Sequence, residues 1–118
     1  MSLNFYDRAG APIAYTDDGE HIFTISGHPV AYLYGGSVYS YQGRHLGVMA
    51  EGVIRDNSGN VAFFTKDARL GVTRPMVRLM PLKGLKQLKP LKQLRQLRPL
   101  KPLNRMTWSQ LSGQQFFF

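Results

Sequence analysis

The sequence contains no cysteine, which excludes disulfide bonds, cysteine nucleophiles and thiolate metal sites. No stretch approaches the roughly 20 consecutive apolar residues that a membrane-spanning helix needs. Residues 1–7 lack the basic and apolar regions of a secretory signal, so we expect a cytoplasmic location. The 118 residues are enough for one domain and not for two.

Acidic residues are missing from the C-terminal part of the chain. Residues 1–67 hold seven acidic and four basic residues, a net charge of −3, whereas residues 68–118 hold eleven basic residues and no acidic one. The entire positive excess of the chain, +8, therefore lies in the C-terminal segment. Any electrostatic attraction of a partner is expected there.

Glycines mark an internal repeat in the N-terminal part. Gly10, Gly27, Gly43 and Gly59 are spaced by 17, 16 and 16 residues, and each precedes a short apolar segment. Turn glycines between runs rich in Val, Ile, Tyr, Phe and Thr are typical of β-hairpins. The pattern predicts eight short strands, near residues 3–7, 11–16, 20–25, 28–33, 37–41, 45–49, 52–56 and 60–65.

The first and last of these strands look like two halves of one unit. We therefore expect residues 3–7 to pair with 60–65 and close the four hairpins into a ring without open edges. A small residue recurs in each unit: Ala14, Ala31, Gly47 and, with the fourth unit shifted by one position, Ala62. Small side chains at equivalent places favour close backbone approach near a pseudo-four-fold axis, although they would also be tolerated facing solvent.

A period of three begins at residue 79. Leucine occupies every third position from Leu79 to Leu103, and Met76 and Met106 extend the series. The positions after the seven leucines from Leu82 to Leu100 hold an uninterrupted row of cations: Lys83, Lys86, Lys89, Lys92, Arg95, Arg98 and Lys101. The remaining position is mostly proline or glutamine. We divide the chain into a hairpin domain (1–70), this basic leucine segment (71–106) and a C-terminal tail (107–118).

The triplets do not fit an α-helix, because its 3.6-residue repeat would spread the leucines around the surface and its hydrogen-bond ladder excludes internal prolines. Polyproline II has three residues per turn and places leucines, cations and the third residues on three separate edges. The segment is thus expected to be polyproline-II-like or irregular, and extended. A long edge of leucines needs a surface to pack against.

Three interpretations of this segment stay open. In the first, the leucines pack on the hairpin domain or on a sister chain, and the cations form a solvated outer face. In the second, the basic row binds a polyanion such as nucleic acid. In the third, leucine and lysine together bind an anionic membrane surface. The terminal Phe116–Phe118 is either a docked or disordered end or a partner-binding tag.

No constellation of catalytic residues stands out. The three histidines, His21, His28 and His45, occupy non-equivalent places in the repeats, so they predict neither a symmetric cluster nor a metal site. The acidic group at 17–20 is typical of turn chemistry, and no nucleophile elbow or phosphate-binding loop is present. The tyrosines at 15–41 alternate along strands, which favours packing between hairpins over base stacking. We expect no enzyme, no cofactor, no metal and no small-molecule substrate.

The residues Gly-His-Pro-Val-Ala-Tyr at 27–32, Tyr-Gln-Gly-Arg-His-Leu-Gly at 41–47 and Asp-Asn-Ser-Gly-Asn-Val-Ala-Phe-Phe at 56–64 resemble the four-fold β-flower family of bacterial proteins. The triplet segment ending near Trp108 strengthens this resemblance, which covers nearly the whole chain. It implies a fold and no chemistry. The sequence thus predicts a homo-oligomeric structural or self-assembly protein with leucines buried within or between chains, and alternatively a polyanion-binding module.

Overall fold

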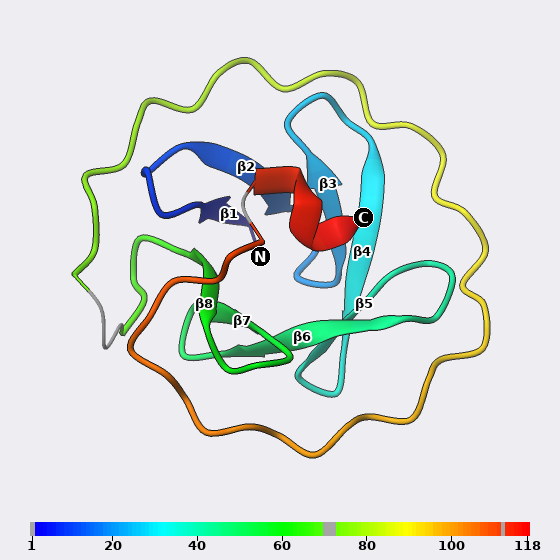
Figure 1. Cartoon of the computed structure of the whole chain (residues 1–118). Coiled ribbons are helices and arrows are strands. Elements are labelled where there is room, and N and C mark those ends of the chain that lie inside the picture. The colour runs from blue at the N-terminus through cyan, green and yellow to red at the C-terminus, as the bar shows by residue number, and fades with distance from the viewer. Residues whose placement is uncertain (1, 70–72, 112) are drawn as a thin grey trace.

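The computed structural model describes residues 2–69, 73–111 and 113–118 and contains a closed antiparallel barrel of eight strands (Figure 1). This confirms the predicted all-β ring, and the ends of each strand lie within two residues of those expected. The strands are β1 Leu3–Tyr6, β2 Pro12–Thr16, β3 His21–Thr24, β4 Pro29–Tyr34, β5 Ser37–Tyr39, β6 His45–Ala50, β7 Val53–Asp56 and β8 Val61–Phe64. The predicted boundary at 70/71 lies outside the described residues.

The barrel closes where the sequence predicted. β1 pairs with β8 through Tyr6 and Phe64, and all other neighbours in the barrel are consecutive along the chain. The contact at the closing pair is shorter than in the hairpins, which share three or four paired positions each. Closure leaves no sheet edge exposed to pairing with another chain.

The four hairpins β1–β2, β3–β4, β5–β6 and β7–β8 carry a bulge at the same place. In each, the register shifts by one residue just after an inward apolar residue: Phe5, Ile22, Val38 and Ile54. A bulge bends a strand and increases its twist, which a small barrel requires. The repeat seen in the sequence is thus a repeat of hairpin and bulge together.

The pairing corrects the expected alignment of the fourth unit. Phe5, Ile22 and Val38 pair with Ala14, Ala31 and Gly47, and Ile54 pairs with Phe63. Phe63, and not Ala62, is therefore the equivalent of the three small residues. The fourth unit is not shifted, because Phe63 follows Gly59 by the same four residues.

The small residues lie in the core and not at the surface. Ala14 and Ala31 are completely buried, and a Cβ on Gly47 would lie 2.0 Å from the backbone oxygen of Arg55. Ala14 and Ala31 join one apolar cluster with the inward residues of all four hairpins. Phe63, the larger residue at the equivalent place, is also fully buried and belongs to the same cluster.

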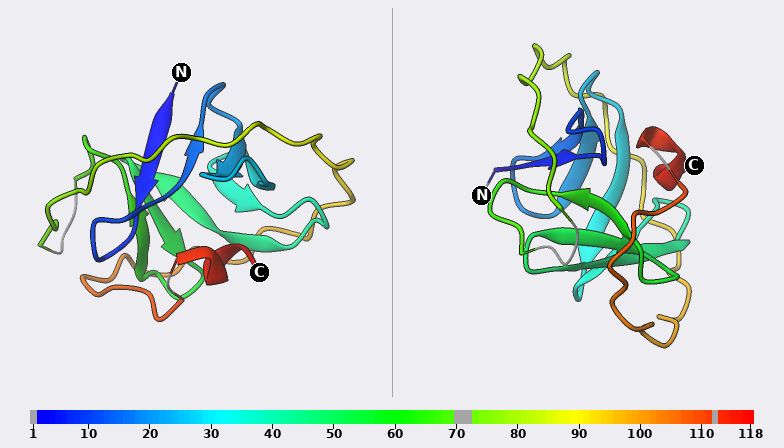
Figure 2. Two further views of the ribbon diagram at one scale, coloured as in Figure 1. Left: turned by 90° about the horizontal axis from the view of Figure 1, so that it is seen from above. Right: turned by 60° about the vertical axis from the view of Figure 1, so that its left-hand side comes forward.

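The C-terminal tail docks on one end of the barrel (Figure 2). A short 3-10 helix, η1 Gly113–Phe117, buries Phe116 and Phe117 to 2 % and 3 % exposure. The ring of Phe117 stacks on Phe63 at 5.4 Å, and that of Phe116 meets Phe63 edge-on at 5.3 Å. Two of the three terminal phenylalanines therefore complete the core, and Phe118 remains 69 % exposed.

Residues 73–105 contain neither helix nor strand and run around the outside of the barrel (Figure 1). We call residues 73–106 the belt. It passes the four hairpins in order, with a gap in the ring where β8 and β1 meet. The chain thereby forms a flat body of 37 × 36 × 24 Å with the belt along its rim.

Candidate functional site

The belt is held by the backbone amides of every third residue. From 75 to 105, each residue at the third position of a triplet either donates its amide to a barrel carbonyl or is a proline, which has no amide to donate. The donors are Arg78, Gly84, Gln87, Gln93, Gln96 and Arg105, and the prolines are Pro75, Pro81, Pro90, Pro99 and Pro102. At six of these eleven positions the backbone amide thus faces the barrel.

Nine belt residues match one hairpin unit. Arg78, Gln87, Gln96 and Arg105 are nine residues apart, and their amides bond to the carbonyls of the four turn glycines, Gly10, Gly27, Gly43 and Gly59. The donor–acceptor distances lie between 2.7 and 3.0 Å. Three triplets therefore span the step from one hairpin to the next, and the belt repeats in register with the barrel.

The turn glycines are required by this contact. All four have positive φ, and a Cβ on any of them would lie 1.9–2.1 Å from a belt carbonyl oxygen. A similar contact runs the other way, because a Cβ on Gly84 would lie 2.2 Å from the oxygen of Ser26. Backbone packs directly on backbone at these points, which only glycine allows.

Each turn glycine is set in place by a side chain three residues earlier. The oxygen of that side chain accepts the amide of the residue after the glycine, over 2.9–3.2 Å. The side chains are those of Asp7, Thr24, Ser40 and Asp56. These short polar residues have the turn chemistry that the sequence indicated, repeated four times.

Cations of the belt lie over aromatic rings of the barrel. The Lys83 ammonium lies 4.1 Å from the ring centre of Tyr15, and that of Lys92 lies 4.6 Å from Tyr32. The Arg95 guanidinium lies 3.6 Å from the ring centre of Tyr34. Each distance is within the range of an attractive cation–π contact.

Two carboxylates of the acidic turn bind the same row. Lys86 pairs with Asp17 at 2.6 Å, and Lys92 pairs with Glu20 at 2.5 Å. The hydrogen bond from Lys86 lowers the pKa of Asp17, and that from Lys92 lowers the pKa of Glu20. The acidic group at 17–20 thus helps to hold the belt, in addition to forming its turn.

The seven residues predicted to bind a polyanion therefore differ in whether they contact the barrel. Five of the seven make barrel contacts: Lys83, Lys86, Lys92 and Arg95 as above, and Arg98 through a 2.8 Å bond to the oxygen of Gly35. Lys89 is exposed, and Lys101 lines a small pocket beside Glu51 and Arg69.

The leucines point away from the barrel, which corrects one of the two expected packing surfaces, the hairpin domain, and leaves the other, a sister chain, untested. All nine leucines from Leu79 to Leu103, which we call the leucine row, are 89–98 % exposed. Met76 and Met106 at its ends are 91 % and 71 % exposed. The reason is that six third-position amides and five of the seven cations bind the barrel, whose outer surface offers carbonyls, aromatic rings and carboxylates, and the leucines occupy the remaining edge.

The far end of the belt is anchored on β8. Val61 donates its amide to Thr107 at 2.9 Å and accepts one from Ser109 at 2.7 Å, so that Trp108 forms a parallel bridge to Val61. The indole of Trp108 also meets the ring of Phe64 at 6.0 Å. In the sequence, Trp108 marks only the end of the triplets, and no pattern there predicts this anchor on β8.

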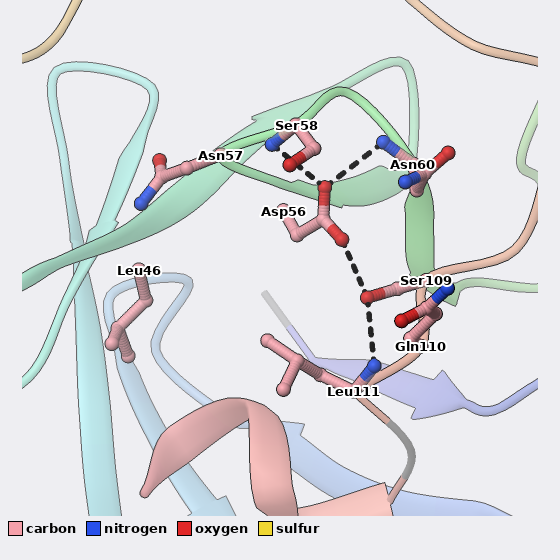
Figure 3. A pocket seen from close by; sticks show the side chains of 8 residues that line it. All are labelled: Leu46, Asp56, Asn57, Ser58, Asn60, Ser109, Gln110 and Leu111. Atoms are coloured by element: carbon pink, nitrogen blue, oxygen red, sulfur yellow. Dashed lines mark hydrogen bonds between the residues drawn. The ribbon is translucent and has the colours of Figure 1, made fainter.

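A surface pocket of about 430 Å³ adjoins this anchor (Figure 3). In it, the Ser109 hydroxyl donates to Oδ2 of Asp56 at 2.5 Å and accepts the amide of Leu111 at 3.1 Å. Oδ1 of Asp56 accepts the amides of Ser58 and Asn60. Both carboxylate oxygens of Asp56 thus accept hydrogen bonds within the chain. Oδ2 holds the tail through Ser109, and Oδ1 holds the turn, so Asp56 and Ser109 form a structural contact.

His45 is the most buried histidine, with 6 % exposure. Its Nδ1 lies 2.8 Å from Oδ1 of Asn57 and its Nε2 lies 2.9 Å from the hydroxyl of Ser37. Because an amide oxygen only accepts, Nδ1 carries the proton of the neutral ring. Burial lowers the pKa of His45, although the bond to Asn57 opposes that effect.

Among residues 2–69, 73–111 and 113–118, no group of three or more histidine and carboxylate side chains is placed to hold a metal ion. Nor does any helix in this part of the chain have the length and apolar character needed to cross a membrane.

The family model of the 4-fold beta flower protein matches residues 3–117. This confirms the resemblance read from the repeats. No curated protein and no solved structure matches the sequence. The match covers both the barrel and the belt that it binds. The chain therefore belongs to the 4-fold beta flower protein family, which is not a known enzyme family.

Proposed function

We propose that this protein is a non-catalytic self-association module and that the leucine row is its contact surface. The observation that carries this proposal is the exposure of nine regularly spaced leucines, each at 89 % or more. Leucines exposed singly are ordinary on a protein surface, but monomeric soluble proteins rarely gather many exposed apolar side chains on one surface. Burying these leucines in an assembly lowers the free energy of the system, because it removes their side chains from water.

The belt holds the row ready for contact. Six amide bonds, distributed from Arg78 to Arg105, pin its backbone to the barrel, and the prolines restrict the segments between them. A contact surface that is already ordered loses little further backbone entropy on binding. An unanchored leucine-rich tail would lose more backbone entropy on binding than this belt does.

Leucine burial supplies the driving force. Each leucine side chain that leaves water contributes about 1.5–3 kcal/mol, whereas association costs about 4–15 kcal/mol in lost freedom of motion. A contact through only a few leucines from each chain is therefore weak, and one through many is stable. Self-association is expected to depend on concentration.

Polyanion binding is supported by the +11 charge of residues 68–118 but less directly by the geometry. Lys83, Lys86, Lys92, Arg95 and Arg98 already bind barrel groups. A nucleic acid would have to compete with those contacts. Its binding would also leave the leucine row in water.

Sedimentation velocity over a wide concentration range tests the proposal. The wild-type chain is expected to shift to larger species with concentration, whereas the variant Leu82→Gln/Leu91→Gln/Leu100→Gln is expected to shift much less. Glutamine occurs at other belt positions, so the backbone tolerates it. Lys89→Gln is the matched control, because it changes an exposed belt side chain and keeps every leucine.

A wild-type chain that stays monomeric at every concentration contradicts the proposal. So does a leucine variant that associates as strongly as the wild type. A loss of association in Lys89→Gln alone would instead assign the contact to charge.

A further inference from the structure

We propose that the leucine row consists of three equivalent patches, each able to bind a second copy of this chain, so that the protein builds open assemblies and not a closed dimer. This inference rests on the proposed self-association and concerns its geometry. It follows from the way in which the belt repeats in register with the barrel.

The four amides at Arg78, Gln87, Gln96 and Arg105 divide the row into three spans of nine residues. Each span holds three leucines at the same places between its two anchors. The first span carries Leu79, Leu82 and Leu85, the second carries Leu88, Leu91 and Leu94, and the third carries Leu97, Leu100 and Leu103.

The spans are equivalent in the supports at their two ends, although the middle of the third holds Pro102 where the first and second have a bonded amide, at Gly84 and Gln93. Each begins and ends on the carbonyl of a turn glycine, and these four glycines occupy matching places in four matching hairpins. Leucine exposure confirms this, since it ranges over 93–98 % in the first span, 90–96 % in the second and 89–97 % in the third. No span is set apart as the contact site.

A second copy is the occupant that fits such a patch. In a polyproline II course, leucines three residues apart are separated by about 9 Å, which leaves room for one leucine between each pair. An identical row, offset by half that spacing, supplies side chains of the right size at the right interval. The cations that would repel a second copy mostly face their own barrel.

The rim shape limits what one neighbour can cover. The body is 37 × 36 Å across and only 24 Å thick, and the belt follows its convex outline (Figure 1). Two such discs meeting edge to edge touch over a part of each rim, so a neighbour on one span leaves the others exposed. Repeated contacts that do not close on themselves give chains or sheets of growing size.

Removing the spans one at a time tests this geometry in the full chain. Variants carry leucine-to-glutamine changes in one, two or all three spans, and their masses are measured by sedimentation equilibrium. The wild type is expected to grow beyond a dimer with concentration. Any single-span variant still passes the dimer, any two-span variant stops at it, and the three-span variant stays monomeric.

Cysteine cross-linking gives a second measurement that leaves the row almost intact. Because the chain has no cysteine, Leu82→Cys, Leu91→Cys and Leu100→Cys each introduce one thiol, in the middle of the first, second and third spans. All three variants are expected to form disulfide-linked dimers on mild oxidation. Lys89→Cys is the control for random collision and is expected to cross-link less.

The outcomes separate this inference from the proposed function. A wild type that stops at a dimer, or cross-linking at only one of the three positions, overturns the three-patch geometry and leaves self-association standing. A wild type that is monomeric throughout overturns both. A monomer that floats with vesicles of neutral phosphatidylcholine would also overturn both, because it assigns the row to lipid.

Discussion

At the scale of single residues, one position breaks the four-fold repeat of the barrel. Ala14, Ala31 and Gly47 are small, and Phe63 stands in the equivalent place of the fourth hairpin. Phe116 and Phe117 from the end of the chain pack on Phe63. The asymmetric position is therefore where the tail is recognised, and it gives the docked end a unique site among four similar hairpins.

The hydroxyls of Tyr39, at the end of β5, and of Tyr41, in the turn that follows, differ in their hydrogen-bond partners. The Tyr41 hydroxyl is buried, and no described residue offers it a hydrogen bond. Burial also raises the pKa of Tyr41 to about 12. We predict that Tyr41→Phe raises the free energy of unfolding by about 1 kcal/mol, because it removes a buried unsatisfied group. Urea unfolding measures the change.

Tyr39→Phe is the matched control for this prediction. The Tyr39 hydroxyl donates to the carbonyl of Gln96 in the belt at 3.2 Å. Its loss is expected to lower the free energy of unfolding by about 1 kcal/mol. Equal losses in the two variants would mean that the Tyr41 hydroxyl has a partner in solution.

His45 predicts a pH dependence of stability. Burial lowers the pKa of His45 in the folded chain, so the unfolded chain takes up a proton first as the pH falls. The contribution of His45 is therefore fully present above about pH 6.5, its unfolded pKa, and is lost as the pH falls toward its folded pKa. Unfolding measured from about pH 7 to about pH 5 is expected to show this loss in the wild type.

The variant His45→Gln isolates that contribution. It removes the titrating ring and keeps a side chain that can bond to Ser37 and Asn57. The difference in unfolding free energy between wild type and variant is expected to shrink as the pH falls. A difference that stays constant with pH contradicts the assignment.

At the scale of elements, the turn glycines are the points where barrel and belt meet. Gly27 has a φ of +97°, and a Cβ there would lie 2.0 Å from the oxygen of Leu85. We predict that Gly27→Ala displaces the belt locally and exposes the amide of Gln87, which bonds to Gly27, to exchange with solvent. Hydrogen exchange of that amide is the measurement.

Gly19→Ala separates the belt contact from backbone strain. Gly19 has a φ of +79°, but a Cβ there would meet nothing within 4 Å. Alanine in this conformation costs about 1–2 kcal/mol at either position. Only Gly27→Ala is expected to cost more and to speed exchange at Gln87. Equal effects of the two substitutions would contradict the backbone packing of belt on barrel.

The elements were more predictable than the way in which they meet. Turn glycines and β-branched runs predicted all eight strands and the closure of β1 on β8. The shift predicted for Ala62 was wrong because residue size indicates equivalence less reliably than the distance from the turn glycine, here Gly59. That distance is fixed by the turn and bulge, which all four hairpins share.

At the scale of the whole molecule, the period of three predicted three faces but not their directions. Leucine burial was expected because apolar residues usually lie inside. The contrary signal was already in the sequence, since Tyr15, Tyr32 and Tyr34 with Asp17 and Glu20 give the barrel an outer surface that attracts cations. The nine-residue match of belt to hairpin needed the structure, because it joins residues far apart in the chain.

The direction of the three faces can be measured in solution by NMR. A soluble paramagnetic agent, added to the chain at a concentration where it is monomeric, relaxes protons that contact solvent. The methyl groups of the leucine row are expected to relax strongly, whereas those of Leu46, which is 7 % exposed, are protected. Leucine-row methyls protected like those of Leu46 would contradict the outward leucine row on which the proposed assembly depends.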